Sequence, residues 1–241
     1  MRVFNSHLDY LRFANNVRWK SRYLWPTEVQ GFLDTVEQAS GSRVQIIPSD
    51  SRVYRAQLGN GWGELPVAGE ETEKVPVPYT ADRMKPKKEW TFEDGASEGR
   101  VNAKGIPCLY AATHLETAIA EQRPWKGSHV TVASLKASRE LRIINCTSDD
   151  SAKIYLAKPD GEEREKAVWW WIDRAFSEPV NRADDHTEYV PTQILAELFR
   201  NSGIDGIGYR SSLGPGYNLA FFDLDAAGVE NRKLIRSRMS V

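Results

Sequence analysis

The stretch GRVNAKGIPCLYAATHLETAIAEQRPW, residues 99–125, decides the fold of this chain of 241 residues. Its middle part, IPCLYAA, is a short apolar run next to glycine and proline, which predicts a buried strand. The segment THLETAIAE predicts a helix that begins at Thr113, because Thr113 and Glu116 have the spacing of a capping box. Pro124 ends that helix, since proline cannot continue the backbone hydrogen-bond ladder. A buried strand followed directly by a helix indicates layered α and β structure.

On the carboxyl side of this stretch, strands and separated helices follow one another. HVTVASLK and LRIINC predict two strands, and a helix is expected from about Glu162 to Phe176. VPTQILAELFRNSG predicts a further helix, with Pro191 in its first turn and Gly203 just past its end. IDGIGYRSS and YNLAFFDL predict two strands around the turn LGPG. No GxGxxG lies between a strand and a helix, so the pattern favours an α+β fold over a Rossmann fold.

On the amino side, the sequence predicts three different regions. Residues 1–44 read as a helical extension, and the strand-like segments RVQIIP and SRVYRAQLG begin a domain expected to cover residues 45–223. Residues 59–98 are rich in Gly, Pro, Glu and Lys and show little periodicity. They predict a long surface loop or lid near the mouth of a binding cleft. Residues 224–241 are expected to form a C-terminal tail.

Composition limits the possible classes of protein. Hydrophobic residues make up 41% and charged residues 27%, which is typical of a globular protein with a packed core. The formal net charge of −1 gives no overall attraction to nucleic acid or to an acidic membrane. Cys108 and Cys146 each lie in an apolar run and are expected to be reduced and buried. The four histidines lack ligand spacing, so no metal is expected, and no segment reads as a signal peptide or membrane span. These features predict a soluble cytoplasmic protein.

Four segments in this order resemble the RES domain, a family named for Arg, Glu and Ser. They are VYRAQLG (53–59), residues 99–125, TQILAELFRNSGIDGIGYRSS (192–212) and GPGYNLAFFD (214–223). The combination GR-x-N, G-x-P-x-LY-A and TA-x-AE is specific, whereas each piece alone would be weak. The resemblance implies an ADP-ribosyltransferase-like core of two small mixed or antiparallel sheets, with an NAD+ cleft between them. It also implies an enzyme that consumes NAD+, as a toxin with a helix-turn-helix antitoxin as partner.

The resemblance also assigns functional residues. Carried over by position, they are Arg55, Arg100, Tyr110, Glu121, Ser211 and Asn218. Glu121, Arg55 and Ser211 are expected to be catalytic. Arg55, Arg100, Tyr110, Ser211 and Asn218 are expected to bind NAD+. Ser212 is adjacent, and the family's Tyr-x-Ser spacing from Tyr209 favours Ser211.

These residue types suit cleavage of the bond between nicotinamide and ribose. Positive charge develops on the ribose in the transition state, and a carboxylate such as Glu121 can stabilise it. The planar guanidinium of arginine binds phosphate oxygens in pairs. Arg55 is expected to hold the pyrophosphate of NAD+, and Arg100 an inorganic phosphate that accepts the ADP-ribose, although both arginines could hold the same pyrophosphate.

Other functions stay open at this point. The acceptor could be a macromolecule, which would make the enzyme an ADP-ribosyltransferase, or water, which would make it an NAD+ glycohydrolase. A catalytically silent interaction module would retain the fold without the chemistry, but the Arg, Glu and Ser set is intact. The eight tryptophans and the basic segment NRKLIRSR suggest nucleic-acid binding. The tryptophans share no strand face, however, so no direct contact with nucleic acid is expected.

Overall fold

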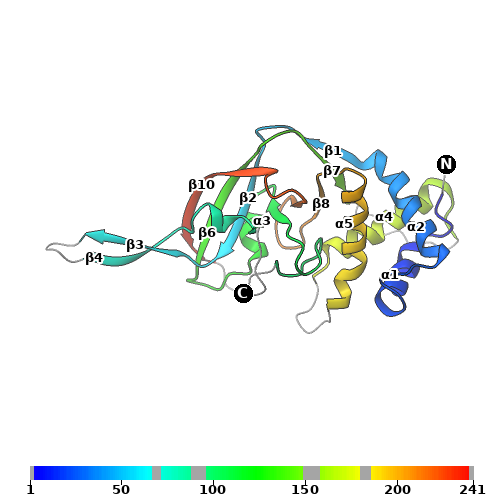
Figure 1. The fold of residues 1–241 in the computed structure, drawn as a ribbon, viewed down its shortest axis with the longest axis horizontal. Helices are drawn as coiled ribbons and strands as arrows, with labels where there is room; N and C mark the ends of the chain where they lie inside the picture. The colour runs from blue at the N-terminus through cyan, green and yellow to red at the C-terminus, as the bar shows by residue number, and fades with distance from the viewer. Residues whose placement is uncertain (1–2, 67–71, 88–95, 149–157, 180–185, 239–241) are drawn as a thin grey trace.

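The described part of the chain contains one large mixed sheet, a separate hairpin and five α-helices (Figure 1). The computed structural model describes residues 3–66, 72–87, 96–148, 158–179 and 186–238. The large sheet consists of β1 (Val44–Ile47), β2 (Arg52–Leu58), β5 (Leu109–Ala112), β6 (His129–Ala137), β7 (Leu141–Asn145), β8 (Gly206–Arg210), β9 (Tyr217–Phe221) and β10 (Ala227–Arg236). The helices are α1 (Asp9–Trp19), α2 (Thr27–Ser40), α3 (Leu115–Glu121), α4 (Gly161–Ser177) and α5 (Val190–Asn201), with single 3-10 turns η1 (Gly41–Arg43), η2 (Asp82–Met84) and η3 (His186–Tyr189). The α+β class expected from the sequence is confirmed.

The sheet has two lobes that meet at a narrow junction. Its strand order is β1-β7-β8-β9-β5-β2-β6-β10. Neighbouring strands are antiparallel except β7 and β8, which run parallel. Between β5 and β2 the register contains a single residue pair, Tyr54 with Ala112. The two lobes therefore separate beyond this pair. The two small sheets that the resemblance implied are joined here at the β5–β2 contact into one continuous sheet.

Four of the helices gather at one end of the molecule (Figure 1). Phe13 of α1 and Leu33 of α2 are buried in one apolar cluster with Trp169 of α4 and Phe199 of α5. Burying an aliphatic or aromatic side chain of this kind contributes about 1.5–3 kcal/mol. The two N-terminal helices thus share a core with α4, α5 and the near lobe of the sheet.

Helix α3 covers the junction of the two lobes. Its Ala118 lies in a buried cluster with Ala56 of β2, Ala112 of β5 and Val132 of β6. The capping box expected at Thr113 is wrong, because α3 begins at Leu115 and has no side-chain cap. The Thr113 hydroxyl instead accepts a hydrogen bond from the backbone N–H of Tyr217 at 2.9 Å. It thereby joins the start of β9 to the start of the helix.

Residues 59–98 do not form the aperiodic loop that their composition suggested. They include β3 (Gly61–Pro66) and β4 (Thr72–Val77), which pair as an antiparallel hairpin. The hairpin extends away from the body of the protein (Figure 1). Its pairing rests on backbone hydrogen bonds, and most of its side chains are exposed, so it lacks the apolar alternation by which strands are recognised. The parts 67–71 and 88–95 of this prediction lie outside the described residues.

The expected C-terminal tail is also wrong over most of its length. Residues 227–236 form β10, which pairs with β6 from Ala227 to Arg236 at the edge of the sheet. Most of its residues are exposed, because an edge strand can present one face to water. No helix among the described residues is long and apolar enough to cross a membrane.

Candidate active site

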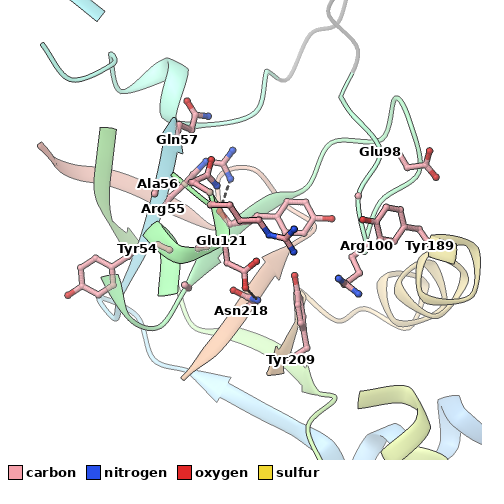
Figure 2. Close-up of a pocket in the computed structure, with 17 residues that line it drawn as sticks. Tyr54, Arg55, Ala56, Gln57, Glu98, Arg100, Glu121, Tyr189, Tyr209 and Asn218 are labelled. Atoms are coloured by element: carbon pink, nitrogen blue, oxygen red, sulfur yellow. Dashed lines mark hydrogen bonds between the residues drawn. The ribbon is translucent and has the colours of Figure 1, made fainter. Parts of the chain in front are cut away.

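A cleft of about 640 Å³ opens where the two lobes of the sheet separate. Its volume lies within the range of about 300–1,000 Å³ that is usual for small-molecule sites. Its walls come from β2, from β5, from the end of α3 and from the segment that precedes β5. Five of the six residues assigned from the sequence line this cleft, namely Arg55, Arg100, Tyr110, Glu121 and Asn218 (Figure 2). The sixth, Ser211, contacts Glu121 directly.

Glu121 is held by two side chains from distant parts of the chain. Its Oε1 accepts hydrogen bonds from Ser211 Oγ at 2.8 Å and from Asn218 Nδ2 at 2.7 Å. Ser211 follows the end of β8, and Asn218 lies in β9. Both donors are buried, whereas Glu121 itself is exposed to the cleft. No described residue donates a hydrogen bond to Oε2, so a carboxylate oxygen is available to a ligand.

The structure distinguishes the two adjacent serines. Ser211 is 8% exposed, and besides donating to Glu121 its hydroxyl accepts a hydrogen bond from the N–H of Leu213 at 3.1 Å. Ser212 is exposed to solvent. The hydroxyl that meets the carboxylate is therefore that of Ser211.

Glu121 lies at the carboxyl end of its helix, where a negative charge is disfavoured unless hydrogen-bond donors compensate for it. Glu121 is the last residue of α3, and the carboxyl end of a helix carries partial negative charge. A carboxylate there is disfavoured by roughly 0.3–1 kcal/mol at an exposed position. Hydrogen bonds from Ser211 and Asn218 offset this cost and fix the orientation of the side chain. The result is an oriented negative charge that would be stabilised further by positive charge developing in the cleft.

Arg55 extends from β2 and is partly buried. Its Nη1 donates to the carbonyl oxygen of Tyr110 at 2.7 Å, which links β2 to β5 beside the junction. Its Nε is buried without a hydrogen-bond partner among the described residues. Burial lowers the pKa of Arg55 from its ordinary value, because a charge is disfavoured away from water. An arginine nevertheless stays protonated, so the cleft contains a cation that a bound anion would stabilise.

Arg100 lies on the opposite wall, in the segment that precedes β5. Its Nη1 donates to the carbonyl oxygen of Ala175 in α4 at 3.0 Å, and its guanidinium carbon lies 5.7 Å from the ring centroid of Tyr189. Neither Arg100 nor Arg55 forms an ion pair with an acidic side chain among the described residues. Within the described part of the chain, two partly buried arginines without an acidic partner therefore face one cleft.

Tyr110 contributes its ring to the cleft, whereas its hydroxyl is used within the protein. The hydroxyl donates to Asn102 Oδ1 at 2.7 Å and accepts from the N–H of Val101 at 3.0 Å. Burial raises the pKa of Tyr110 well above its ordinary value. Gly99 passes so close that an added Cβ would lie 2.6 Å from this hydroxyl. The glycine of the GR-x-N motif is thus required by the approach of the backbone to Tyr110.

The first turn of α5 holds the segment that carries Arg100. Thr192 Oγ1 donates to the carbonyl oxygen of Arg100 at 2.7 Å. Gln193 Nε2 lies 2.9 Å from the carbonyl oxygen of Gly99, 3.1 Å from that of Asn102 and 3.0 Å from Glu98 Oε1. Both side chains are buried. This pair, which we call the α5 clamp, fixes residues 98–102 against the helix.

Several cleft residues were not identified from the sequence. Tyr209 is buried, burial raises its pKa above the ordinary value, and it packs against Phe176 with ring centroids 5.7 Å apart. Period-two alternation places Tyr209 and Ser211 on one face of the chain, a signal that could have indicated it. The remaining polar or aromatic lining side chains are Tyr54, Gln57, Glu98, Gln122, Arg123 and Tyr189. Arg123 has a φ of 44°, a left-handed conformation that is uncommon for a residue other than glycine.

The chemistry of the cleft is that of an anion site with a carboxylate. Its cations are arginines that can hold phosphate groups, its aromatic rings can stack on planar groups, and its oriented glutamate can stabilise a cation. Among the described residues, no cluster of three or more His, Cys, Asp or Glu side chains could hold a metal ion. Both cysteines are free and buried.

Comparison with known proteins supplies a family. No curated protein sequence matches the chain significantly. The chain is similar to a solved structure from M. tuberculosis, the crystal structure of the MbcT–MbcA toxin–antitoxin complex. The identity is 11% and the TM-score 0.40, over 84% of this chain and 91% of that chain. The RES domain family matches residues 77–238, which is more than half of the chain and includes five of the six assigned residues. The protein therefore belongs to the RES domain family.

Proposed function

We propose that the protein breaks the bond between nicotinamide and ribose in NAD+, and that inorganic phosphate accepts the ADP-ribose. One observation carries this proposal: two arginines that have no acidic partner among the described residues line the same cleft as a glutamate that Ser211 and Asn218 orient. NAD+ brings a pyrophosphate anion and a ribose that becomes positively charged during the reaction. Membership of the RES family supports NAD+ as the substrate.

Glu121 would act on the nicotinamide ribose. Nicotinamide leaves NAD+ as a neutral molecule, and the ribose then carries oxocarbenium character. The carboxylate would stabilise this charge and accept a hydrogen bond from a ribose hydroxyl, while Ser211 and Asn218 keep it in place. No proton transfer to the leaving group is needed, because nicotinamide is already cationic in NAD+.

The two arginines would divide the anionic groups between them. In Figure 2, Arg55 and Arg100 lie on opposite sides of Glu121, with Arg100 toward Tyr189. We propose that Arg100 holds the pyrophosphate and that Arg55 holds the accepting phosphate beside the ribose, which reverses the assignment expected from the sequence. A phosphate oxygen then attacks the anomeric carbon as nicotinamide departs, and the product is ADP-ribose 1″-phosphate.

Hydrolysis and ADP-ribosyl transfer to a macromolecule use the same site and differ in the acceptor. Incubation of the purified protein with NAD+, with and without phosphate, separates them. ADP-ribose 1″-phosphate, free ADP-ribose and a labelled macromolecule are the three distinguishing products. The proposal expects the first product and is overturned by the absence of nicotinamide release.

A toxin role within a toxin–antitoxin pair is proposed as well. The RES family resemblance supports it, and the M. tuberculosis protein of the similar structure is named as a toxin bound to an antitoxin. Expression of the chain should arrest growth and lower cellular NAD+, whereas the Glu121→Gln variant should do neither. Growth arrest by both the wild type and Glu121→Gln would show that toxicity does not depend on this site.

A further inference from the structure

Tyr209 carries a hydroxyl group that the described part of the protein does not use. The residue is 6% exposed, and its ring lies in the apolar cluster around α4 and α5, where it packs against Phe176. The same residue lines the cleft, and Figure 2 shows its hydroxyl end pointing into the cleft. Among the described residues, none forms a hydrogen bond with this hydroxyl. A tyrosine buried to this extent usually has a hydrogen-bond partner, and phenylalanine would make the same ring contacts without leaving a polar group unpaired. We therefore expect the partner to be a ligand in the cleft.

The neighbouring strand fixes where this hydroxyl lies. Tyr209 of β8 is paired with Asn218 of β9 in the antiparallel register, so the two side chains are neighbours on one face of the sheet. Asn218 in turn donates the hydrogen bond of 2.7 Å that holds Glu121. In Figure 2 the hydroxyl end of Tyr209 lies between Asn218 and Arg100. Tyr209 therefore occupies the part of the cleft between the carboxylate of Glu121 and the guanidinium of Arg100.

The hydroxyl of Tyr209 is a neutral donor near physiological pH. Burial raises the pKa of Tyr209 above its ordinary value, while the positive charge of Arg100 lowers this pKa and the negative charge of Glu121 raises it. Both charges therefore act on the hydroxyl, which agrees with its place between them. A protonated hydroxyl in this place can donate a hydrogen bond to an anion.

We infer that the Tyr209 hydroxyl donates a hydrogen bond to the phosphate group attached to the nicotinamide ribose. The inference rests on the proposed function, in which Glu121 contacts that ribose and Arg100 the pyrophosphate. Along the substrate, this phosphate lies between the two contacts, just as Tyr209 lies between Glu121 and Arg100 in the protein. A hydrogen bond to a charged phosphate oxygen is stronger than one between neutral groups.

The lack of charge on this donor suits its position beside Glu121. A lysine or arginine in place of Tyr209 would attract the carboxylate of Glu121 and reduce the negative charge available to the ribose cation. A hydroxyl can hold a phosphate oxygen and leave the charge of Glu121 unchanged. The donor next to the reacting ribose is therefore neutral, whereas Arg100 supplies the positive charge for the rest of the pyrophosphate.

The experiment measures the dissociation constants of ADP-ribose, ADP and AMP by calorimetry, so that no turnover is required. ADP contains the phosphate in question but not the ribose beyond it, and AMP contains neither. Tyr209→Phe removes only the hydroxyl oxygen, so it should weaken the binding of ADP-ribose and of ADP alike, by about tenfold, and leave that of AMP unchanged.

Tyr10→Phe is the matched control. Tyr10 is 3% exposed, and its hydroxyl also lacks a hydrogen-bond partner among the described residues, but it lies in α1 and does not line the cleft. This variant should bind all three ligands as the wild type does.

Each outcome decides the inference. Unchanged affinities in Tyr209→Phe overturn it, as does a loss that ADP-ribose and ADP do not share, a loss of the same size for AMP, or a wild-type protein that binds none of the three. Removal of an unpaired hydroxyl should not lower the Tm, so a variant that fails to fold also overturns the inference, because the hydroxyl would then act within the protein. A protein that shows the expected pattern of binding but releases no nicotinamide from NAD+ supports this inference and refutes the proposed function.

Discussion

The hydroxyl of Ser211 donates a hydrogen bond to Oε1 of Glu121 at 2.8 Å, across a sequence separation of 90 residues. This contact joins the end of α3 to the end of β8 and so connects two motifs that are far apart in the sequence. It also places a buried donor on the carboxylate proposed to stabilise the ribose cation.

Ser211→Ala should lower kcat for nicotinamide release by roughly tenfold, because a hydrogen bond to a charged group is worth about 1.5–3 kcal/mol and Asn218 retains part of the orientation. Ser212→Ala is the matched control and should leave kcat unchanged, since Ser212 is exposed. Steady-state kinetics with NAD+ measures both variants. An equal loss of kcat in Ser211→Ala and Ser212→Ala would show that Ser211 acts only by maintaining the fold of the turn.

Substitution of Arg55 tests which molecule accepts the ADP-ribose. If it holds the accepting phosphate, a phosphate titration at constant ionic strength should accelerate NAD+ loss saturably in the wild type. Arg55→Lys should need a much higher phosphate concentration, because lysine retains the charge but loses the paired hydrogen bonds. Arg100→Lys should instead raise the KM for NAD+. Indifference of the wild-type rate to phosphate would exclude phosphorolysis and leave water or a macromolecule as the acceptor.

The α5 clamp should set the affinity for NAD+ through the loop that carries Arg100. Gln193→Leu removes the donor to Gly99, Asn102 and Glu98, so we expect a loss of about 1–3 kcal/mol in the free energy of unfolding. The KM for NAD+ should rise several-fold, with kcat little changed. Glu197→Leu, on the exposed side of the same helix, is the control for the introduction of leucine. A variant with normal KM would show that the clamp does not position the site.

Stability should fall above pH 10 in part through Tyr110. Burial raises the pKa of this hydroxyl above its ordinary value of 10.0, so in the unfolded chain it loses its proton at a lower pH than in the folded protein. Its contribution is therefore intact below about pH 10 and is lost as pH rises further. Urea unfolding gives the free energy of unfolding at pH 8 and above pH 10. Between these two conditions, this free energy should decrease less for Tyr110→Phe than for the wild type. Parallel decreases would assign the effect to other groups.

The sequence predicted the parts of the fold that have a strong apolar period. β5, β6, α4 and α5 occur where expected. The two helices bury one face each, and the two strands are buried on both faces, so their apolar residues form patterns that the sequence records. The β3–β4 hairpin and β10 were missed for the opposite reason, since their exposed side chains leave no alternation to detect. Residues 67–71, at the hairpin's connection, lie outside the described part of the chain.

The candidate site was predicted through motifs, and its supporting contacts were not. The motifs assigned both Glu121 and Ser211 to the site, and the structure shows that these two residues form a hydrogen bond. No local sequence pattern connects them. Glu98, Gln193 and Tyr189 were missed because a polar residue in a loop, or in the first turn of a helix, resembles an ordinary solvated side chain. Only the packing of α5 on residues 98–102 shows their role.

The most direct test of the central claim is the release of nicotinamide from NAD+ by the wild-type protein and by Glu121→Gln. The substitution preserves size and removes the negative charge that would stabilise the ribose cation. We predict release by the wild type, a decrease in rate on the order of a thousandfold in the variant, and little change in Tm. No release by the wild type, or near-normal release by Glu121→Gln, would contradict the account.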